Sequence, residues 1–146
     1  SCQSLKIVNF EGGFAPRSNG DNLGFDEFVI NSRISIKDYL KKIKESVVVF
    51  NTPAVLKCHG WKLAEYLALS KVIISTPISR ELPDSLIDYK HLLLTDGSEE
   101  DIEKKVIEII SNPELAKELS SQSKEYFDKY LSPKSVCQII VDNLKK

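Results

Sequence analysis

Short apolar runs rich in β-branched residues alternate along the chain with segments that have helical periodicity. Val47 to Phe50, Lys71 to Thr76 and His91 to Thr95 have the length of buried strands. Segments of helical period separate them, as in proteins whose helices cross over between parallel strands. The pattern predicts an α/β protein with a mostly parallel sheet, and it places Val47 to Phe50 as a central strand covered on both faces.

Two further strands and a long loop are predicted near the amino end. Leu5 to Phe10 alternates in character, and Phe28 to Asn31 is a second short apolar run. Gly12 to Gly24, between them, is rich in Gly, Asn, Asp and Ser. A loop of that length in a compact domain is usually either functional or disordered, and the sequence leaves both open.

Two helices are predicted in the first half of the chain. Ser35 can cap a helix in which Ile36, Tyr39 and later apolar residues share one face. Trp61 to Leu69 has almost no polar face, which indicates a buried helix. A large aromatic residue at a helix start more often packs than binds, so we expect Trp61 to pack against the sheet.

Three helices are predicted to close the chain, each with its own start signal. Ser98 is followed three residues later by Asp101, Asn112 precedes a proline, and Ser132 precedes another. Apolar residues recur at helical spacing in all three segments. On the last helix this stripe consists of Val136, Ile139, Ile140 and Leu144.

Length and charge limit the number of domains and the classes of partner. The chain of 146 residues has the length of about one domain, and 42% of its residues are hydrophobic. It has 20 basic and 21 acidic residues and a net charge of -1, so its overall charge does not attract nucleic acid. We expect a single domain over residues 1–146 that does not bind nucleic acid.

The cysteines and the apolar runs bear on compartment and metal binding. Cys2, Cys58 and Cys137 are widely spaced and odd in number, which favours free thiols. His59 and His91 are the two imidazoles, and apart from the adjacent Cys58 and His59 the sequence has no zinc-ligand spacing. The apolar runs are far shorter than the ~20 residues that cross a bilayer. We expect a cytoplasmic protein without metal or cofactor.

The loop after Val47 to Phe50 is the first candidate for a site, because parallel sheets bind ligands at the carboxyl ends of their strands. Gly60 at the start of the next helix lets a ligand approach the backbone. The N–H groups of Trp61, Lys62 and Leu63 would then face an anion such as a diphosphate.

Side chains around this helix start add charge and an acceptor. Lys57, His59 and Lys62 could supply positive charge or donors, and for His59 a packing role is equally open. Glu65 lies one turn into the helix, where a carboxylate can accept hydrogen bonds from the vicinal hydroxyls of a ribose. Glu65 could instead be a solvated helix residue, but its apolar neighbours favour a ligand. The combination indicates a nucleoside diphosphate.

Several segments, in matching order and spacing, resemble the carboxyl-terminal, donor-binding domain of GT-B glycosyltransferases of the group 1 or family 4-like type. The resemblance covers most of the chain, from Ile34 to Val141. It implies a Rossmann-like, mostly parallel sheet flanked by helices, the carboxyl-terminal half of a GT-B enzyme, with further helices at the carboxyl end. The matching segments are Tyr39 to Pro53, Gly60 to Ser75, Glu81 to Pro83, His91 to Leu94 and Asn112 to Leu115.

The resemblance also implies roles for single residues. Arg33 and Ile34 would line the nucleobase, and the glycine loop at Gly60 would hold the diphosphate. Glu65 matches the second glutamate of the family's E-x7-E motif, which binds ribose. The first glutamate touches the donor sugar, and at that position this chain has Lys57, which could instead neutralise a phosphate. No residue is assigned a catalytic role.

For the whole protein, the resemblance implies a hexosyltransferase of polysaccharide biosynthesis. The enzyme would move a hexose from a nucleoside diphosphate sugar, as substrate, to a sugar or lipid-linked acceptor. This chain would be one half of it, inactive without an amino-terminal acceptor domain, and the full enzyme could associate peripherally with a membrane. The alternatives are a non-catalytic α/β binding or scaffold module and a nucleotide-sugar epimerase of GT-B architecture.

Overall fold

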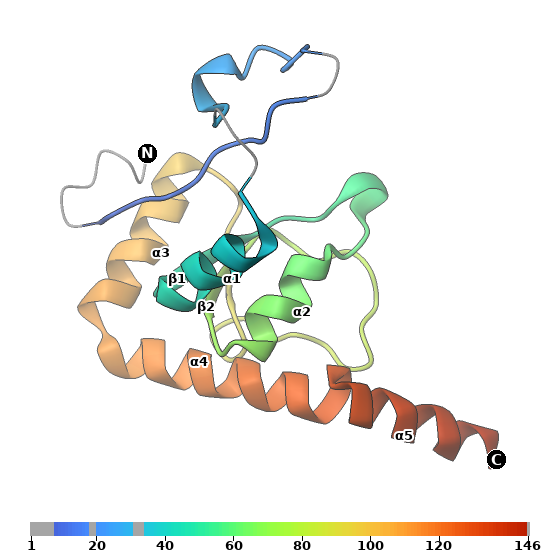
Figure 1. Cartoon of the computed structure of the whole chain (residues 1–146). Helices are drawn as coiled ribbons and strands as arrows, with labels where there is room; N and C mark the ends of the chain where they lie inside the picture. Colours follow the sequence, from blue (N-terminus) through green and yellow to red (C-terminus); the bar gives the residue numbers. More distant parts are fainter. Residues whose placement is uncertain (1–7, 18–19, 31–33, 146) are drawn as a thin grey trace. The chain divides into compact units, whose positions relative to one another are not determined.

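The computed structural model describes residues 8–17, 20–30 and 34–145 of the chain. It divides into two compact units, residues 1–45 and residues 46–146 (Figure 1). The second unit contains the sheet and most of the helices.

The sheet of the second unit has three parallel strands in its described part. These are β1 (Val48–Asn51), β2 (Val72–Ser75) and β3 (Leu93–Leu94), and they lie in the order β1-β2-β3. Along this sheet Val48 pairs with Val72, and Ile74 pairs with Leu93. All four residues of β2 are buried. The predicted α/β class with a parallel sheet is confirmed.

The prediction that Val47 to Phe50 is a central strand is wrong. β1 is at an edge of the described sheet, and the central strand is β2. Val47 lies outside β1 and is 68% exposed. A continuous apolar run indicates burial of a strand's faces, but it carries no information on how many neighbouring strands bond to its edges.

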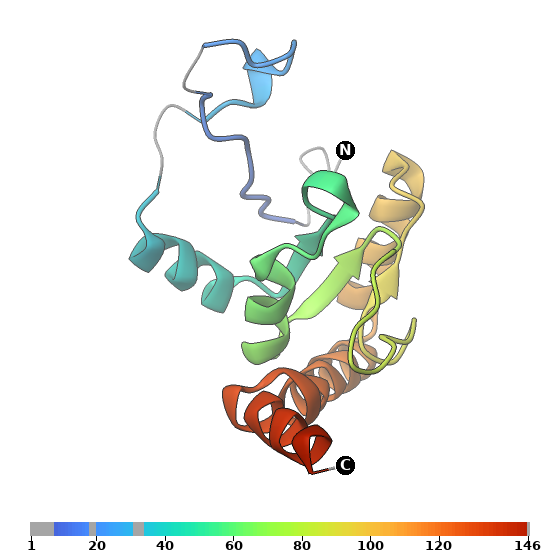
Figure 2. The same ribbon diagram turned by 90° about the vertical axis from the view of Figure 1, so that its right-hand side faces the viewer.

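Helices flank this sheet. They are α2 (Trp61–Ala68), α3 (Glu99–Ser111) and α4 (Pro113–Tyr126), whereas α5 (Pro133–Leu144) continues beyond α4, away from the strands (Figure 1). Figures 1 and 2 show α2 and α3 on opposite sides of the strands. α2 packs on β1, and α4 packs on α2, α3 and β2. The arrangement is consistent with a Rossmann-like fold.

The three carboxyl-terminal helices begin where the sequence predicts. Ser98 Oγ accepts a hydrogen bond from the Asp101 N–H at 3.2 Å, and Asn112 Oδ1 accepts one from the Leu115 N–H at 3.1 Å. Ser132 Oγ likewise caps α5, which starts with a proline as α4 does. Each cap satisfies an N–H that has no partner within its helix.

Two hydroxyls of α4 fix this helix at the amino end of β2. Ser120 Oγ donates to the Ser70 carbonyl at 2.6 Å, and Ser123 Oγ donates to the Lys71 carbonyl at 3.2 Å. Both carbonyls precede β2 in the chain. α4 therefore packs at the end of the strand opposite to the one where the candidate site is expected.

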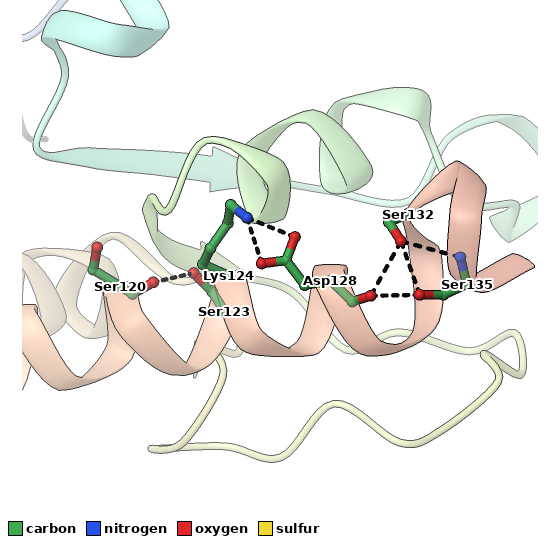
Figure 3. A network of polar contacts seen from close by, with 6 residues as sticks. All are labelled: Ser120, Ser123, Lys124, Asp128, Ser132 and Ser135. Carbon is green, nitrogen blue, oxygen red and sulfur yellow. Dashed lines mark hydrogen bonds and ion pairs between the residues drawn. The ribbon is translucent and has the colours of Figure 1, made fainter.

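A π-helical turn, Phe127–Leu131, joins α4 to α5 (Figure 3). The Ser132 and Ser135 hydroxyls both donate to the Asp128 carbonyl, at 3.1 and 2.5 Å. The Asp128 carboxylate pairs with Lys124 one turn earlier. The two hydroxyls thus give the Asp128 carbonyl of the widened turn the hydrogen bonds that a backbone N–H would supply in a regular helix.

The apolar core of the second unit lies between the sheet and its helices. α5 contributes no buried side chain, and its apolar residues are uncovered. Ile140 is 53% exposed and Leu144 is 81% exposed. None of the described helices has the length and apolar character that crossing a bilayer requires. The largest fully buried apolar side chains are Leu67, Ile73, Ile74, Leu92, Leu93, Ile109 and Leu119.

In the first unit, α1 (Ile36–Glu45) begins as predicted, with Ser35 Oγ accepting a hydrogen bond from the Asp38 N–H at 3.1 Å. The predicted strand Phe28 to Asn31 is wrong in its described part. Asp26–Phe28 forms a 3-10 turn, and Val29 makes only a single bridge, to Phe14. The Phe28 and Val29 N–H groups are bonded within the turn, which leaves them unable to extend a ladder.

Half of the predicted strand Leu5 to Phe10, residues 5–7, lies outside the described residues. The three of its residues that are described, 8–10, belong to no strand. Between 12 and 24 the described residues form the predicted loop, with a turn at 22–25 closed by an Asn22 carbonyl that accepts from the Phe25 N–H.

Candidate functional site

β1 and β2 both end in polar residues at the carboxyl edge of the sheet. Asn51 and Ser75 are register partners, and Asn51 Nδ2 donates to Ser75 Oγ at 2.9 Å. Ser75 Oγ in turn donates to the Thr76 carbonyl at 2.8 Å. Asn51 is 5% exposed, and its Oδ1 has no partner among the described residues. The buried Thr76 Oγ1 also lacks one there. At this edge of the sheet, Asn51 Oδ1 and Thr76 Oγ1 could therefore each form a further hydrogen bond.

Two depressions lie beside this edge, between β1 and the start of α2. The smaller is a recess of about 10 Å³, and the larger is an open hollow of about 350 Å³. The larger volume is within the range of small-molecule sites. Asn51, Thr52, Pro53, Lys57, His59, Gly60, Leu63, Ile78 and Ser79 line the recess, and Thr52, Pro53, Ala54, Gly60, Trp61 and Lys62 line the hollow.

The loop between β1 and α2 closes on itself around the short turn η3 (Val55–Lys57). The Ala54 N–H donates to the Cys58 carbonyl at 2.8 Å, and the Lys57 N–H donates to the Ala54 carbonyl at 3.1 Å. Leu56 and Lys57 both have left-handed backbones, with φ of 57° and 59°. That conformation is costly for residues with a Cβ, so the closed loop must hold them in it.

A second loop, after β2, braces the first. Ser79 Oγ donates to the Lys57 carbonyl at 3.4 Å, and an Arg80 guanidinium N–H donates to the Leu56 carbonyl at 3.3 Å. His59 Nε2 lies 3.3 Å from the Glu81 carbonyl, a pairing that requires the Nε2–H tautomer. One ring nitrogen of His59 therefore helps to hold the two loops together, and the side chain also lines the recess.

The first turn of α2 offers fewer N–H groups than the sequence suggests. The expectation that Leu63 contributes one is wrong, because its N–H donates to the Gly60 carbonyl at 3.2 Å. The Trp61 and Lys62 N–H groups have no partner among the described residues, and no side chain there caps the turn. Two N–H groups and the positive end of the helix dipole remain for an anion.

Trp61 does not pack against the sheet as expected. Its side chain is 80% exposed and lines the hollow. Leu63, Tyr66 and Leu67 form the buried face of α2 instead. Side chains of a helix lean toward its amino end, so a residue in the first position extends past the helix start instead of over the sheet.

The remaining predicted site residues are not gathered at these depressions. Glu65 is half-buried one turn after Trp61 and lines neither depression. Arg33 lies outside the described residues, and Ile34 is exposed in the first unit. The structure brings together Lys57, His59, Gly60, Trp61 and Lys62.

Asn51 was predicted only as the first residue of the candidate loop, Asn51 to Gly60, and Ser79 was not predicted as a lining residue at all. Asn51 carried a usable signal, because a polar residue directly after an apolar run marks the carboxyl end of a strand. Ser79 carried none, since only the folding of the second loop against the first brings it to the recess.

The charge around the hollow is positive. Lys57 and Lys62 are exposed and line the two depressions, and no carboxylate is among the lining residues. Within the described residues, no group of three His, Cys, Asp or Glu side chains is placed to hold a metal ion. The arrangement can bind an anion with lysine charge and backbone N–H groups, next to an aromatic face.

The sequence was compared with models of known protein families and with curated proteins, and neither comparison found a match.

Proposed function

We propose that this chain binds a nucleoside diphosphate sugar as the donor half of a GT-B glycosyltransferase of the group 1 or family 4-like type. The observation that carries the proposal is the 350 Å³ hollow at the start of α2, lined by Gly60, Trp61 and Lys62. It lies at the carboxyl end of β1, where α/β sheets bind nucleotides.

In this proposal the diphosphate sits against the first turn of α2. The Trp61 and Lys62 N–H groups donate to phosphate oxygens, and the Lys57 and Lys62 ammonium groups balance their charge. Those same groups stabilise the diphosphate as it leaves the sugar, which is where negative charge grows during transfer. The site then requires no metal for this role.

The nucleoside part of the donor rests on the resemblance. Glu65 would accept hydrogen bonds from the ribose hydroxyls, and Arg33 with Ile34 would line the base. A hexose would be transferred to a sugar or lipid-linked acceptor held by an amino-terminal domain outside this chain, and a lipid-linked acceptor would bring the whole enzyme to a membrane surface.

Ligand-observed NMR with UDP, GDP, ADP and CDP and their sugar conjugates tests the proposal. We expect selective binding of one nucleotide, lost in Glu65→Gln and retained in Glu118→Gln, which changes an exposed glutamate of α4. If neither the chain nor the whole protein that contains it binds any nucleotide of the panel, the proposal is overturned.

The second candidate function is a non-catalytic scaffold module. It is favoured by the uncovered apolar residues of α5, which resemble a surface for a partner more than part of a core. Lys57 in place of a sugar-binding carboxylate points the same way. Failure of the whole protein to bind any nucleotide would favour the scaffold module. Inversion of the sugar of a nucleotide sugar in the absence of an acceptor would instead indicate an epimerase.

A further inference from the structure

Trp61 is the most exposed aromatic side chain among the described residues, at 80%, and it is one wall of the hollow. Single exposed apolar residues are common and need no function. Trp61 differs because its exposed surface borders a concave space of ligand size next to two N–H groups without partners among the described residues. A ring held in that space would bury much of the indole face.

The direction of α2 indicates which ring of the donor would lie against Trp61. Trp61 and Glu65 are four residues apart, so they lie on the same side of α2 one turn from each other. Trp61 leans past the amino end of the helix, and Glu65 lies toward its interior. With the ribose at Glu65 and the phosphates at the first turn, the group beyond the phosphates extends toward Trp61.

We infer, on the basis of the proposed function, that Trp61 stacks against the pyranose ring of the donor sugar. The face of an indole carries partial negative charge and attracts the polarised C–H groups on one face of a pyranose. Thr52 and Lys62, which also line the hollow, are placed to contact the hydroxyl rim. The sugar would thus be selected through an apolar face, with no carboxylate of the lining residues contributing.

The fluorescence of Trp61 can report a ligand bound in the hollow, because Trp61 is the single tryptophan of the chain. The experiment titrates the protein with UDP and UDP-glucose, GDP and GDP-mannose, and ADP and ADP-glucose. Tryptophan emission is recorded alongside ligand-observed NMR, so that stacking and binding are measured separately. Trp61→Ala and Trp61→Phe are compared with Leu144→Ala, which removes an equally exposed apolar side chain from α5.

We expect the sugar conjugate, but not its parent diphosphate, to shift the emission. Trp61→Ala should weaken binding of the conjugate about tenfold and change binding of the diphosphate less than about twofold. Trp61→Phe should recover most of the loss, and Leu144→Ala should bind as the unchanged protein does.

Three results would overturn the inference, and they differ from one another. An equal emission shift with UDP and UDP-glucose would mean that Trp61 stacks on the base. Binding by NMR without any emission shift would mean that the indole is not in the site. Absence of NMR binding for every nucleotide, in this chain and in the whole protein that contains it, would remove the proposed function itself, and this inference with it.

Discussion

At the scale of single residues, the lack of a side chain at Gly60 is not explained by its backbone. Its φ of -75° and ψ of 147° are available to any residue, and an added Cβ would meet only Ala54 Cβ, at 3.9 Å. Glycine is also not the best residue at a helix N-cap, where serine is preferred. Space for a ligand at the first turn of α2 is a sufficient reason for a glycine at position 60.

Gly60→Ser separates folding from binding. The serine hydroxyl should cap α2, so the free energy of unfolding should rise by a few tenths of a kcal/mol, at most about 1 kcal/mol. A cap on the Lys62 N–H, at the second helical position, removes that donor from the proposed phosphate. A hydrogen bond to a charged group is worth about 1.5–3 kcal/mol, so nucleotide-sugar affinity should then fall at least about tenfold. Urea denaturation and NMR titration measure the two effects. Unchanged affinity in the stable variant would show that Gly60 is not reserved for a ligand.

His91 predicts how stability depends on pH. It is 7% exposed, its Nδ1 accepts a hydrogen bond from the Ile87 N–H at 2.9 Å, and its ring lies 5.1 Å from that of Tyr126. Burial is the main cause that lowers the pKa of His91, and the charge of Lys90 lowers it further, against weaker opposing effects of Asp84 and Glu125. The folded state therefore binds the proton less readily than the unfolded state.

The free energy of unfolding should consequently fall as pH is lowered from about 7, through the unfolded histidine value of about 6.5, toward 5. His91→Asn places an amide oxygen near the position of Nδ1, where it can accept from Ile87 and cannot titrate. In that variant the fall over this range should flatten. Denaturation at several pH values measures the slope, and an equal slope in both proteins would contradict the role given to His91. The low pKa values of Asp84 and Asp96 act only in more acidic solution.

At the scale of elements, α2 ends in a Schellman motif with an unfavourable residue in its left-handed position. The Lys71 N–H donates to the Tyr66 carbonyl at 3.0 Å, and the Ser70 N–H donates to the Leu67 carbonyl at 3.2 Å. Ser70 has a φ of 54°, a conformation that glycine adopts without the strain of a Cβ.

Ser70→Gly should therefore stabilise the protein by about 0.5–1 kcal/mol, the relief of strain exceeding the added entropy of the unfolded chain. The Ser70 carbonyl, which accepts from Ser120, is unaffected by the change. Chemical denaturation measures the gain. Ser70→Ala is the matched control, because it removes the hydroxyl and keeps the strain, so no gain is expected from it. A gain of the same size in Ser70→Ala would place the effect in the hydroxyl.

The elements divide into those fixed by local chemistry and those fixed by their surroundings. Caps such as Ser98 and Asn112 act over three residues, and the sequence predicts them because both partners of the bond are close in the chain. The edge position of β1 and the exposure of Trp61 depend on what packs next to them, which no local pattern records. The predicted strand Phe28 to Asn31 was wrong in its described part for a related reason, because the Phe28 and Val29 N–H groups donate within the 3-10 turn at Asp26–Phe28.

The candidate site divides in the same way. Gly60 and the lysines near it were recognisable from their place before a predicted helix. The recess, by contrast, exists because the Ser79 to Glu81 segment folds back on the loop of Lys57 and His59. That contact joins residues 22 positions apart, and only the tertiary fold establishes it.

At the scale of the whole molecule, apolar burial and the candidate site both belong to the second unit. Among the described residues, every buried apolar side chain except Ile43 lies in residues 46–146, as do all residues that line the two depressions. A unit of that length is large enough to hold a core of its own. Arg33 and Ile34, the residues proposed for the nucleobase, lie outside this segment of the sequence.

Residues 46–146 expressed alone should therefore unfold in one cooperative transition and still bind the donor through its phosphates and sugar. Base selectivity should weaken, because the segment proposed to contact the base is missing, so the affinities for UDP, GDP and ADP should converge relative to those of the whole chain. Thermal denaturation followed by circular dichroism tests the first expectation, and the NMR panel tests the second. A gradual melt with exposed apolar surface would show that the first unit is needed for the core, whereas full selectivity in a cooperatively folded fragment would move the base site into residues 46–146.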